Sequence, residues 1–380
     1  MPKIVVGMSG GVDSSVSAYL LKEQGYEVEG ISLVLWEAGR RTDFSTCCSL
    51  QVMQEVSKTC ERIGIPHRII DVRDDFIGKV IEPFVDAYSA GLTPNPCILC
   101  NKFIKFPFLL KEAEKTGAEL IATGHYARVE RKDSGVQGFK DSRESSEFRL
   151  RSPVFLKKGI DPKKDQSYVL YILGQKELRK LILPLGHYRK EEVRKMAQEL
   201  GLPAAERSES QEICFIEERN YFKFIEKLSP IAGKPGPILD LAGKAIGTHK
   251  GIHGYTIGQR KGLGISFPEP FYVARIDALK NTIHVGPQEA AKKREFLLGD
   301  LNWIVPPPAD SFKASVKIRS TMKDQLATIF LVKNQELQVK NPTGVRVVFD
   351  DPQWAPAPGQ SAVFYDGDIV IGGGVIKISA

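Results

Sequence analysis

The stretch Gly7-Met8-Ser9-Gly10-Gly11-Val12-Asp13-Ser14 decides the fold, because it stands where a strand passes into a helix. Before it, the apolar run Ile4-Val5-Val6 is typical of a strand that is buried on both faces of a parallel sheet. After it, apolar and aromatic residues recur at helical spacing, at positions 12, 16, 19 and 20. The sequence therefore predicts a strand–loop–helix unit with this loop at the N-terminus of the helix.

The residues of this loop favour the binding of an anion. Gly10 and Gly11 permit a tight turn in which successive backbone N–H groups point at one oxyanion, and the helix dipole adds to the attraction. The loop has neither the Gly-Lys-Ser/Thr of a Walker loop nor the Gly-x-Gly-x-x-Gly of a dinucleotide site. A glycine pair in such a turn often has a structural role only. The complete Ser-Gly-Gly-x-Asp-Ser pattern is more specific and resembles the loop of the PP-loop ATP pyrophosphatases, which implies cleavage of ATP between its α and β phosphates.

Length and composition indicate a globular protein of two or three domains. The chain has 380 residues, of which 42% are hydrophobic and 26% charged. No apolar run approaches the length of a membrane span, and the N-terminus runs directly into a strand without a leader sequence. These features predict a cytoplasmic protein that does not enter a membrane. Six cysteines in a chain of this length do not indicate a disulfide scaffold.

The α/β pattern predicts a Rossmann-like domain with a parallel sheet. Strands at residues 28–36, 68–72 and 120–124 alternate with helices up to about residue 203. Residues 9–14, 33–36 and 124–125 would then meet at the carboxyl ends of the strands. A glycine-rich segment follows, and from about residue 280 short strands recur, at 282–285, 314–318, 328–332, 345–349, 361–365 and 369–371. We predict a PP-loop domain at residues 1–207, a small central α+β domain at 208–279 and a C-terminal β-barrel at 280–380.

A Cys-x-x-Cys pair forms the second informative stretch, Pro94-Asn95-Pro96-Cys97-Ile98-Leu99-Cys100-Asn101-Lys102. Its two prolines rule out a helix before Cys97, which places both thiols on or just after a rigid loop. Lys102 and Lys105 favour the thiolate, the reactive form of cysteine. Such a pair can be a redox pair, half of a metal site, or a nucleophile with a neighbour.

The remaining cysteines do not complete a zinc site, because none of them forms a second closely spaced pair with ligand spacing. Cys60 lies on the apolar face of its helix and is expected to pack in the core. Cys47 and Cys48 begin a helix in polar surroundings, and their role stays open. Cys214 follows the end of the α/β pattern, in a segment that could close over a neighbouring site.

A set of motifs that spans nearly the whole chain resembles the tRNA-specific 2-thiouridylase family. The motifs occur in order: residues 9–14, the Pro94–Lys102 stretch, Ala122-Thr123-Gly124-His125-Tyr126, Lys164-Asp165-Gln166-Ser167-Tyr168, Cys214-Phe215-Ile216 and Gly258-Gln259-Arg260-Lys261-Gly262-Leu263-Gly264. The resemblance implies a sulfurtransferase that replaces the C2 oxygen of the wobble uridine in the tRNA anticodon loop by sulfur and converts ATP to AMP and pyrophosphate. It also implies Mg²⁺, which offsets the phosphate charge, and a sulfur donor protein such as a cysteine desulfurase or a sulfur relay protein.

The resemblance also implies a role for each matching residue. Cys214 would carry a persulfide, and Cys100 would act as nucleophile and close a disulfide with Cys214 as sulfur leaves. Asn95, Pro96 and Cys97 would line the target base. The residues expected to bind ATP are Gly7, Met8, Ser9, Gly10, Gly11, Val12, Asp13, Ser14, Leu33 and Gly124. Those expected to bind tRNA are His125, Lys164, Asp165, Gln166, Arg319, Ser320 and Gln360.

The chain departs from the family pattern at Cys97, where an Asp is expected. A thiol is a poorer general base than a carboxylate, so an essential base at this position is in doubt. The substitution also creates three cysteines, 97, 100 and 214, that could surround one site. Three thiolates can hold three irons of a [4Fe–4S] cluster and leave the fourth iron open to a sulfide. A cluster-dependent route is therefore a hypothesis beside the persulfide–disulfide route.

The positive charge of the chain is concentrated in one stretch, which could bind nucleic acid. Residues 151–195 contain twelve Lys or Arg against five acidic residues, an excess equal to the net charge of +7 of the whole chain. The stretch is either a solvated face or a surface for the phosphate backbone, with Tyr168, Tyr171 and Tyr188 interleaved. Two other functions stay open: an RNA-binding module with a vestigial ATP site, and another PP-loop ligase or amidotransferase, which would not need Cys100 and Cys214.

Overall fold

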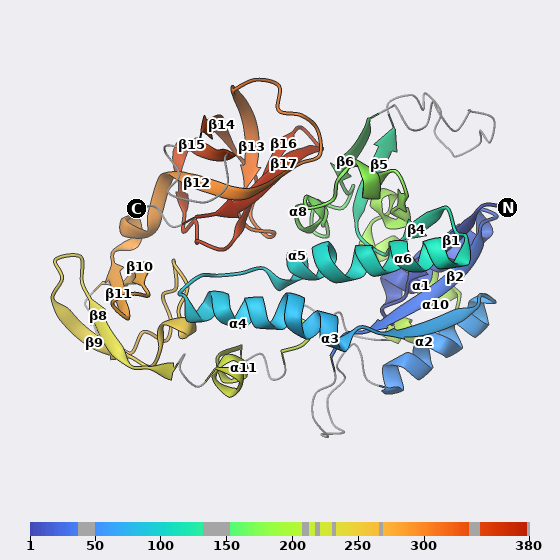
Figure 1. Ribbon diagram of the computed structural model, residues 1–380, viewed down its shortest axis with the longest axis horizontal. Helices are drawn as coiled ribbons and strands as arrows, with labels where there is room; N and C mark the ends of the chain where they lie inside the picture. Colours follow the sequence, from blue (N-terminus) through green and yellow to red (C-terminus); the bar gives the residue numbers. More distant parts are fainter. Residues whose placement is uncertain are drawn as a thin grey trace.

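The computed structural model describes residues 1–36, 50–131, 153–206, 213–216, 221–229, 233–265, 269–333 and 343–377. Cys47 and Cys48, whose role the sequence leaves open, lie outside the described residues. In Figure 1 the parallel sheet lies near the N-terminus, the β-barrel near the C-terminus, and a small sheet beside the barrel. Among the helices of the described residues, none has the length and apolar character that crossing a membrane requires.

The first sheet has five parallel strands in the order β3-β2-β1-β4-β7. These strands are β1 (Lys3–Gly7), β2 (Glu27–Val34), β3 (His67–Asp71), β4 (Leu120–Ala122) and β7 (Leu181–Ile182). The order reverses between β1 and β4, and a crevice at such a switch point is where ligands bind in open α/β sheets. The predicted Rossmann-like sheet is confirmed.

Apolar side chains alternate between the two sides of β1, and helices cover both faces of this sheet. Ile4 and Val6 point to one face and pack with helices α1 (Val12–Glu23), α2 (Leu50–Ile63) and α10 (Lys190–Glu199). Val5 points to the other face and packs with α6 (Phe106–Thr116). Cys60, on α2, is fully buried in the first of these clusters, as predicted, and burial raises the pKa of its thiol to about 12.

The helix that follows β3 is divided. Helix α3 (Arg73–Phe76) passes through a π-helical turn (Ile77–Ile81) into α4 (Glu82–Ser89). The same pattern recurs where α5 (Pro96–Cys100) passes through a π turn (Asn101–Lys105) into α6. In both places a proline follows the π turn by two residues, at Pro83 and Pro107. Because proline lacks an N–H and its ring crowds the carbonyl four residues earlier, one wider turn relieves the contact.

The second sheet is small and has the order β10-β11-β8-β9. Its strands are β8 (Gly236–Leu239), β9 (Ala245–His249), β10 (Tyr272–Asp277) and β11 (Thr282–Gly286). Helix α11 (Tyr221–Leu228) precedes it. The strand expected at 282–285 thus forms, but it pairs with β10 and β8 and not with the barrel strands to which the sequence pattern assigned it. A short turn at Asp277–Thr282 allows this antiparallel pairing, which strand spacing alone does not reveal.

The barrel closes through six strands, because β12 pairs with both β15 and β17. The strands are β12 (Lys292–Trp303), β13 (Ser311–Lys317), β14 (Gln325–Lys333), β15 (Thr343–Trp354), β16 (Ser361–Asp366) and β17 (Ile369–Ile376). Two strands from the first part of the chain, β5 (Ala127–Arg131) and β6 (Val154–Lys158), extend this sheet beyond β17. The predicted C-terminal barrel is confirmed.

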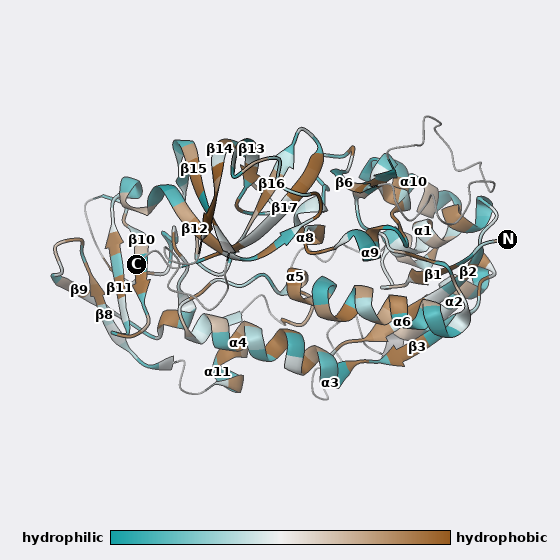
Figure 2. Cartoon of the chain, turned by 45° about the horizontal axis from the view of Figure 1, so that its top comes forward, coloured by the Kyte–Doolittle hydropathy of each residue, from teal (hydrophilic) through white to brown (hydrophobic). Residues whose placement is uncertain are grey.

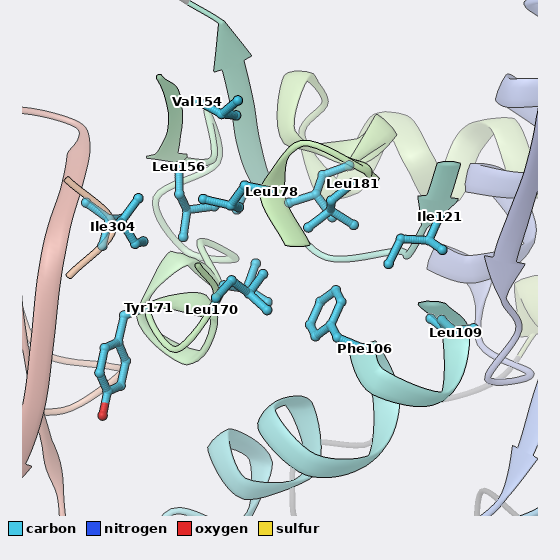
Figure 3. Close-up of a cluster of buried hydrophobic side chains, with 14 of the residues drawn as sticks. Phe106, Leu109, Ile121, Val154, Leu156, Leu170, Tyr171, Leu178, Leu181 and Ile304 are labelled. Atoms are coloured by element: carbon cyan, nitrogen blue, oxygen red, sulfur yellow. The ribbon is translucent and has the colours of Figure 1, made fainter. Parts of the chain in front are cut away.

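A shared hydrophobic core joins the barrel to the first domain. Figure 3 shows this cluster extending from Ile121 and Leu109 beside the first sheet to Tyr171 and Ile304 beside the barrel strands. Helices α8 (Ser167–Leu170) and α9 (Gln175–Leu178) lie between them. In Figure 2, α4 and α6 carry both hydrophobic and hydrophilic residues around their circumference, as expected for helices with one buried face.

Candidate functional site

The loop after β1 offers an open helix N-terminus. Helix α1 begins at Val12, and no side chain of the described residues caps it at Gly11. Gly10 has a φ of 78°, a conformation that glycine adopts without strain. The Ser14 hydroxyl accepts a hydrogen bond from the Ser9 N–H at 3.2 Å and donates one to the Gly11 carbonyl at 3.1 Å. These bonds fold the loop around the first N–H groups of α1, which favour an anion.

Neighbouring strands fix the position of this loop. A Cβ on Gly124 would lie 2.7 Å from the carbonyl carbon of Asp13 and 2.8 Å from the nitrogen of Ser14, so only glycine permits this approach. The N–H of Met8 donates to the Ile31 carbonyl at 2.7 Å, and the Met8 carbonyl accepts from the Ser32 hydroxyl at 2.8 Å. The expected meeting of residues 9–14 with Gly124 is therefore confirmed, and Met8 lies beside Ile31 and Ser32 near the end of β2; the contact of the loop with residues 33–36 stays a prediction.

Asp13 has two partners that sequence reasoning missed. The ammonium of Lys190, on α10, donates to both carboxylate oxygens of Asp13, at 2.7 and 2.8 Å. The hydroxyl of Tyr126 donates to one of the same oxygens at 2.7 Å. Lys190 was counted with the basic surface of residues 151–195, but it is buried. Its only sequence signal is its position at the start of a helix that packs against α1.

The Cys-x-x-Cys pair lies on α5. The Asn95 side chain caps this helix by accepting from the N–H groups of Cys97 and Ile98, at 3.1 and 3.4 Å, and Pro96 occupies the first turn. Cys100 is only 5% exposed, whereas solvent reaches Cys97. Desolvation by neighbouring atoms raises the pKa of the Cys97 thiol, nearby Lys105 lowers it, and the charge of a Cys214 thiolate raises it.

The segment 213–216 brings the third thiol to this helix. Phe215 is buried against Phe76 and Phe84, with ring centroids 5.6 and 5.4 Å apart, and belongs to the same hydrophobic cluster as Cys100. The adjacent Cys214 is exposed, and its charge acts on Cys97. The four described cysteines are thiols and not disulfide-bonded. Two segments more than a hundred residues apart in the sequence thus meet at one site.

The three thiols as placed do not fit an iron–sulfur cluster. Among the described residues, which include Cys97, Cys100 and Cys214, no three His, Cys, Asp or Glu side chains are grouped so that they could hold a metal ion. Cys100 packs among apolar side chains, and desolvation raises the pKa of the Cys97 thiol. Neither environment favours the thiolates that a cluster needs.

His125 follows β4 and is buried. Its ring stacks on Phe106 with centroids 5.9 Å apart, and its Nδ1 lies 2.8 Å from the Thr123 hydroxyl. Burial, together with the charge of Lys105, lowers the pKa of His125 to about 3. The imidazole is therefore neutral at physiological pH, and any contact that it makes with tRNA is a hydrogen bond or a stacking contact.

Several other residues expected to contact tRNA bind within the protein. Asp165 accepts hydrogen bonds from the N–H groups of Gly159 and Ser167. Gln360 donates to the Thr93 carbonyl at 3.0 Å, and Arg319 donates to the carbonyls of Ile257 and Ala355 at 3.3 and 3.0 Å. Lys164 is half-buried and Ser320 is exposed. The roles of these residues in tRNA binding stay predictions.

Two tyrosines of the basic stretch are not on its surface. Tyr168 and Tyr171 are at most 1% exposed, and their hydroxyls bond to Ser361 of the barrel, at 2.8 and 3.0 Å. The expectation that they interleave with a phosphate backbone is therefore wrong: these rings fill the core between two domains. Part of the positive charge is also neutralised, since Lys157 pairs with Glu130 and Lys158 with Asp324.

Comparison with known proteins covers nearly the whole chain. Three family models match in order: a tRNA methyl transferase HUP domain at residues 2–218, a tRNA methyl transferase PRC-barrel domain at 223–287 and an aminomethyltransferase beta-barrel domain at 293–376. The chain is 45% identical to a tRNA-specific 2-thiouridylase MnmA 1 of Caldanaerobacter subterraneus over 99% of this chain and 98% of that protein.

Two further relatives carry the same name. The chain is 42% identical to the tRNA-specific 2-thiouridylase MnmA of Halothermothrix orenii, over 99% of both chains, and 41% identical to that of Clostridioides difficile, over 99% of this chain and 98% of the relative. Full-length similarity at this level, on a PP-loop domain whose switch point carries the Ser-Gly-Gly-x-Asp-Ser loop beside a cysteine pair, identifies the chain as a member of the tRNA-specific 2-thiouridylase family.

Proposed function

We propose that this protein is a tRNA-uridine 2-sulfurtransferase. It uses ATP to activate C2 of the wobble uridine and replaces the C2 oxygen by sulfur, releasing AMP and pyrophosphate. The observation that supports the proposal most directly is the arrangement of two features: an open helix N-terminus at the switch point of the sheet, and two cysteine segments that meet beside Phe215.

The first step is the adenylation of the uridine. The N–H groups at the start of α1 and the Ser9 and Ser14 hydroxyls suit the triphosphate. Mg²⁺, when bound, offsets the charge of the phosphates. Adenylation turns the C2 oxygen into part of a leaving group, because the carbonyl of a uracil ring is a poor electrophile without it. Gly124 and Leu33 lie at the same edge, where the adenosine part of ATP would lie.

The second step is the transfer of sulfur. The terminal sulfur of a Cys214 persulfide attacks C2, and AMP leaves. The thiolate of Cys100 then attacks Sγ of Cys214, which releases the thiocarbonyl and forms a Cys100–Cys214 disulfide. The two thiols supply the two electrons that reduce the sulfane sulfur, and a dithiol reductant restores them. Because Cys100 is buried, this step requires a local movement of the segment 213–216 or of α5.

The proposed reaction requires two macromolecular partners, a tRNA and a sulfur donor protein. The target base would lie against Asn95, Pro96 and Cys97 after it leaves the stack of the anticodon loop. Lys164, Asp165, Gln166, His125, Arg319, Ser320 and Gln360 are proposed to form or support the tRNA surface. A persulfide-bearing sulfur donor protein would load the exposed Cys214. We propose that the reaction takes place in the cytoplasm, where tRNA and a reducing thiol pool are present.

The test is a reconstituted reaction. Purified protein is incubated with unmodified tRNA, Mg·ATP and a persulfide donor; AMP is quantified, and 2-thiouridine is measured by mass spectrometry of the nucleosides. A tRNA with cytidine at the wobble position is the matched control and should yield no 2-thiouridine. AMP without 2-thiouridine would favour another PP-loop ligase, and tRNA binding without AMP would favour an RNA-binding module.

The same preparation separates the two sulfur routes. The protein is purified without oxygen, and its iron and acid-labile sulfide are assayed. An iron-free enzyme that thiolates tRNA with the persulfide donor supports the route through Cys100 and Cys214. Thiolation that requires stoichiometric iron, and that is lost in Cys97→Ser, would refute that route in favour of the cluster.

A further inference from the structure

Asp13 of the ATP loop is held by two side chains from outside the loop. Lys190 contacts both of its carboxylate oxygens and Tyr126 contacts one, all within 2.8 Å. Lys190 lies in addition 5.7 Å from the centroid of the Tyr126 ring. Lys190 is 7% exposed and Tyr126 is 2% exposed, whereas the Asp13 side chain is 34% exposed, so two buried groups hold a carboxylate that solvent still reaches. In such a network each hydrogen bond depends on the geometry of the others.

Both partners of Asp13 continue into the segment 161–166, which contains three of the residues expected to contact tRNA. The backbone N–H of Lys190 donates to the Asp161 carboxylate at 3.1 Å. That carboxylate also accepts the N–H of Lys163 at 3.0 Å, and the Asp161 carbonyl accepts the N–H of Lys164 at 3.1 Å. Asp161 thus joins the start of α10 to this basic segment.

The second connection runs through the backbone of Tyr126. Its N–H donates to the side-chain oxygen of Gln166 at 2.9 Å, and its carbonyl accepts the backbone N–H of Gln166 at 2.8 Å. Gln166 is therefore held on both sides by the residue whose hydroxyl holds Asp13. Two separate chains of hydrogen bonds connect the ATP loop to the segment 161–166.

We propose that Lys190 and Tyr126 are positioning residues that couple the two substrate sites, so that ATP and tRNA each bind more tightly when the other is present. The inference rests on the proposed function. A triphosphate bound at the start of α1 fixes Asp13, and a fixed Asp13 holds Lys190 and Tyr126, which order Asp161 and Gln166. The second substrate then binds with a smaller loss of conformational entropy, because the first has already ordered the segment.

The experiment measures this coupling directly. The affinity of an ATP analogue that cannot be cleaved between its α and β phosphates is determined with Mg²⁺, with and without saturating unmodified tRNA. We expect tRNA to tighten binding of the analogue by about fivefold or more, the lower end of typical coupling between sites, and the analogue to tighten tRNA binding by the same factor. This reciprocity distinguishes coupling from a nonspecific effect.

The decisive variant is Tyr126→Phe. It removes only the hydroxyl that contacts Asp13 and leaves the two backbone hydrogen bonds with Gln166 in place. The matched control is Tyr171→Phe, which also removes one buried tyrosine hydroxyl, bonded to Ser361 at 3.0 Å, but lies outside the network. We expect the coupling to fall below about twofold in Tyr126→Phe and to keep its wild-type value in Tyr171→Phe. Lys190→Met, checked for folding by thermal unfolding, should lower the coupling as well.

The outcomes separate this inference from the proposed function. If neither the ATP analogue nor tRNA binds to the wild-type protein, the proposed function fails. If both bind but independently, or if Tyr126→Phe keeps the full coupling factor, the proposed function stands and the coupling is refuted.

Discussion

Replacing Gly124 by alanine should disturb the ATP loop directly. The added Cβ would lie 2.7 and 2.8 Å from backbone atoms of Asp13 and Ser14, whereas ordinary contacts begin at 3.4 Å, so one of the two segments must move by about 0.7 Å. Backbone atoms cannot give way as the end of a flexible side chain can. A displacement of this size at a catalytic loop lowers the rate by about 10- to 100-fold, and overpacking costs about 1–3 kcal/mol of stability.

The assay is the rate of AMP formation at saturating tRNA, with urea unfolding measured in parallel. Gly78→Ala is the matched control: it lies in a helical segment, and its Cβ would meet only the end of the Glu82 side chain at 3.9 Å. The control should keep the wild-type rate and gain up to about 1 kcal/mol of stability. Wild-type AMP formation by the Gly124→Ala variant would refute the argument that this close approach positions the loop.

Three further predictions follow from contacts on either side of the site. In single-turnover reactions, Cys100→Ser and Cys214→Ser should each abolish 2-thiouridine while the ATP analogue still binds; full thiolation by either variant would exclude its thiol from the relay. Because the folded-state pKa of His125 is lowered to about 3, the unfolded chain takes up its proton first, near its ordinary pKa of 6.5. Stability from this residue is therefore present above about pH 6.5 and is lost as the pH falls toward 3, by up to about 2 kcal/mol at pH 5; urea unfolding of His125→Asn should show a shallower loss over this range, and equal slopes would contradict the assignment. Tyr168→Phe leaves the buried Ser361 carbonyl without its 2.8 Å donor and should cost about 1–3 kcal/mol in urea unfolding, with an unchanged affinity for the ATP analogue.

What could be predicted from the sequence was local. The apolar run before Gly7 and the helical spacing after Gly11 determine the first strand–loop–helix unit, because both patterns are complete within a few residues. The cysteine pair after two prolines is likewise a local signal, but α5 begins at Pro96 and carries both thiols, which the prolines were expected to place on or just after a loop. Parallel strands bring their carboxyl ends to one edge whatever their exact limits, so the meeting of Gly124 with residues 9–14 could be expected without knowing the structure.

What could not be predicted depends on contacts between distant residues. Lys190 and Asp13 are 177 positions apart, and a lysine in a basic stretch has no local feature that marks it as buried. Tyr168 and Tyr171 lie among cations in the sequence, which hides the fact that the barrel covers them. The strand at Thr282–Gly286 has the composition of a barrel strand, and only its partners assign it to the smaller sheet.

The joining of β6 to β17 affects how the protein is made. In this pair Lys157 lies opposite Ile369, and Arg128 forms a salt bridge with Asp368 in the same region. During synthesis, β5 and β6 leave the ribosome more than two hundred residues before their partner strand does. Until then the nascent chain carries an uncovered strand edge beside Tyr168 and Tyr171, a surface that invites aggregation. The sheet that β5 and β6 extend is therefore complete only after β17 has been translated.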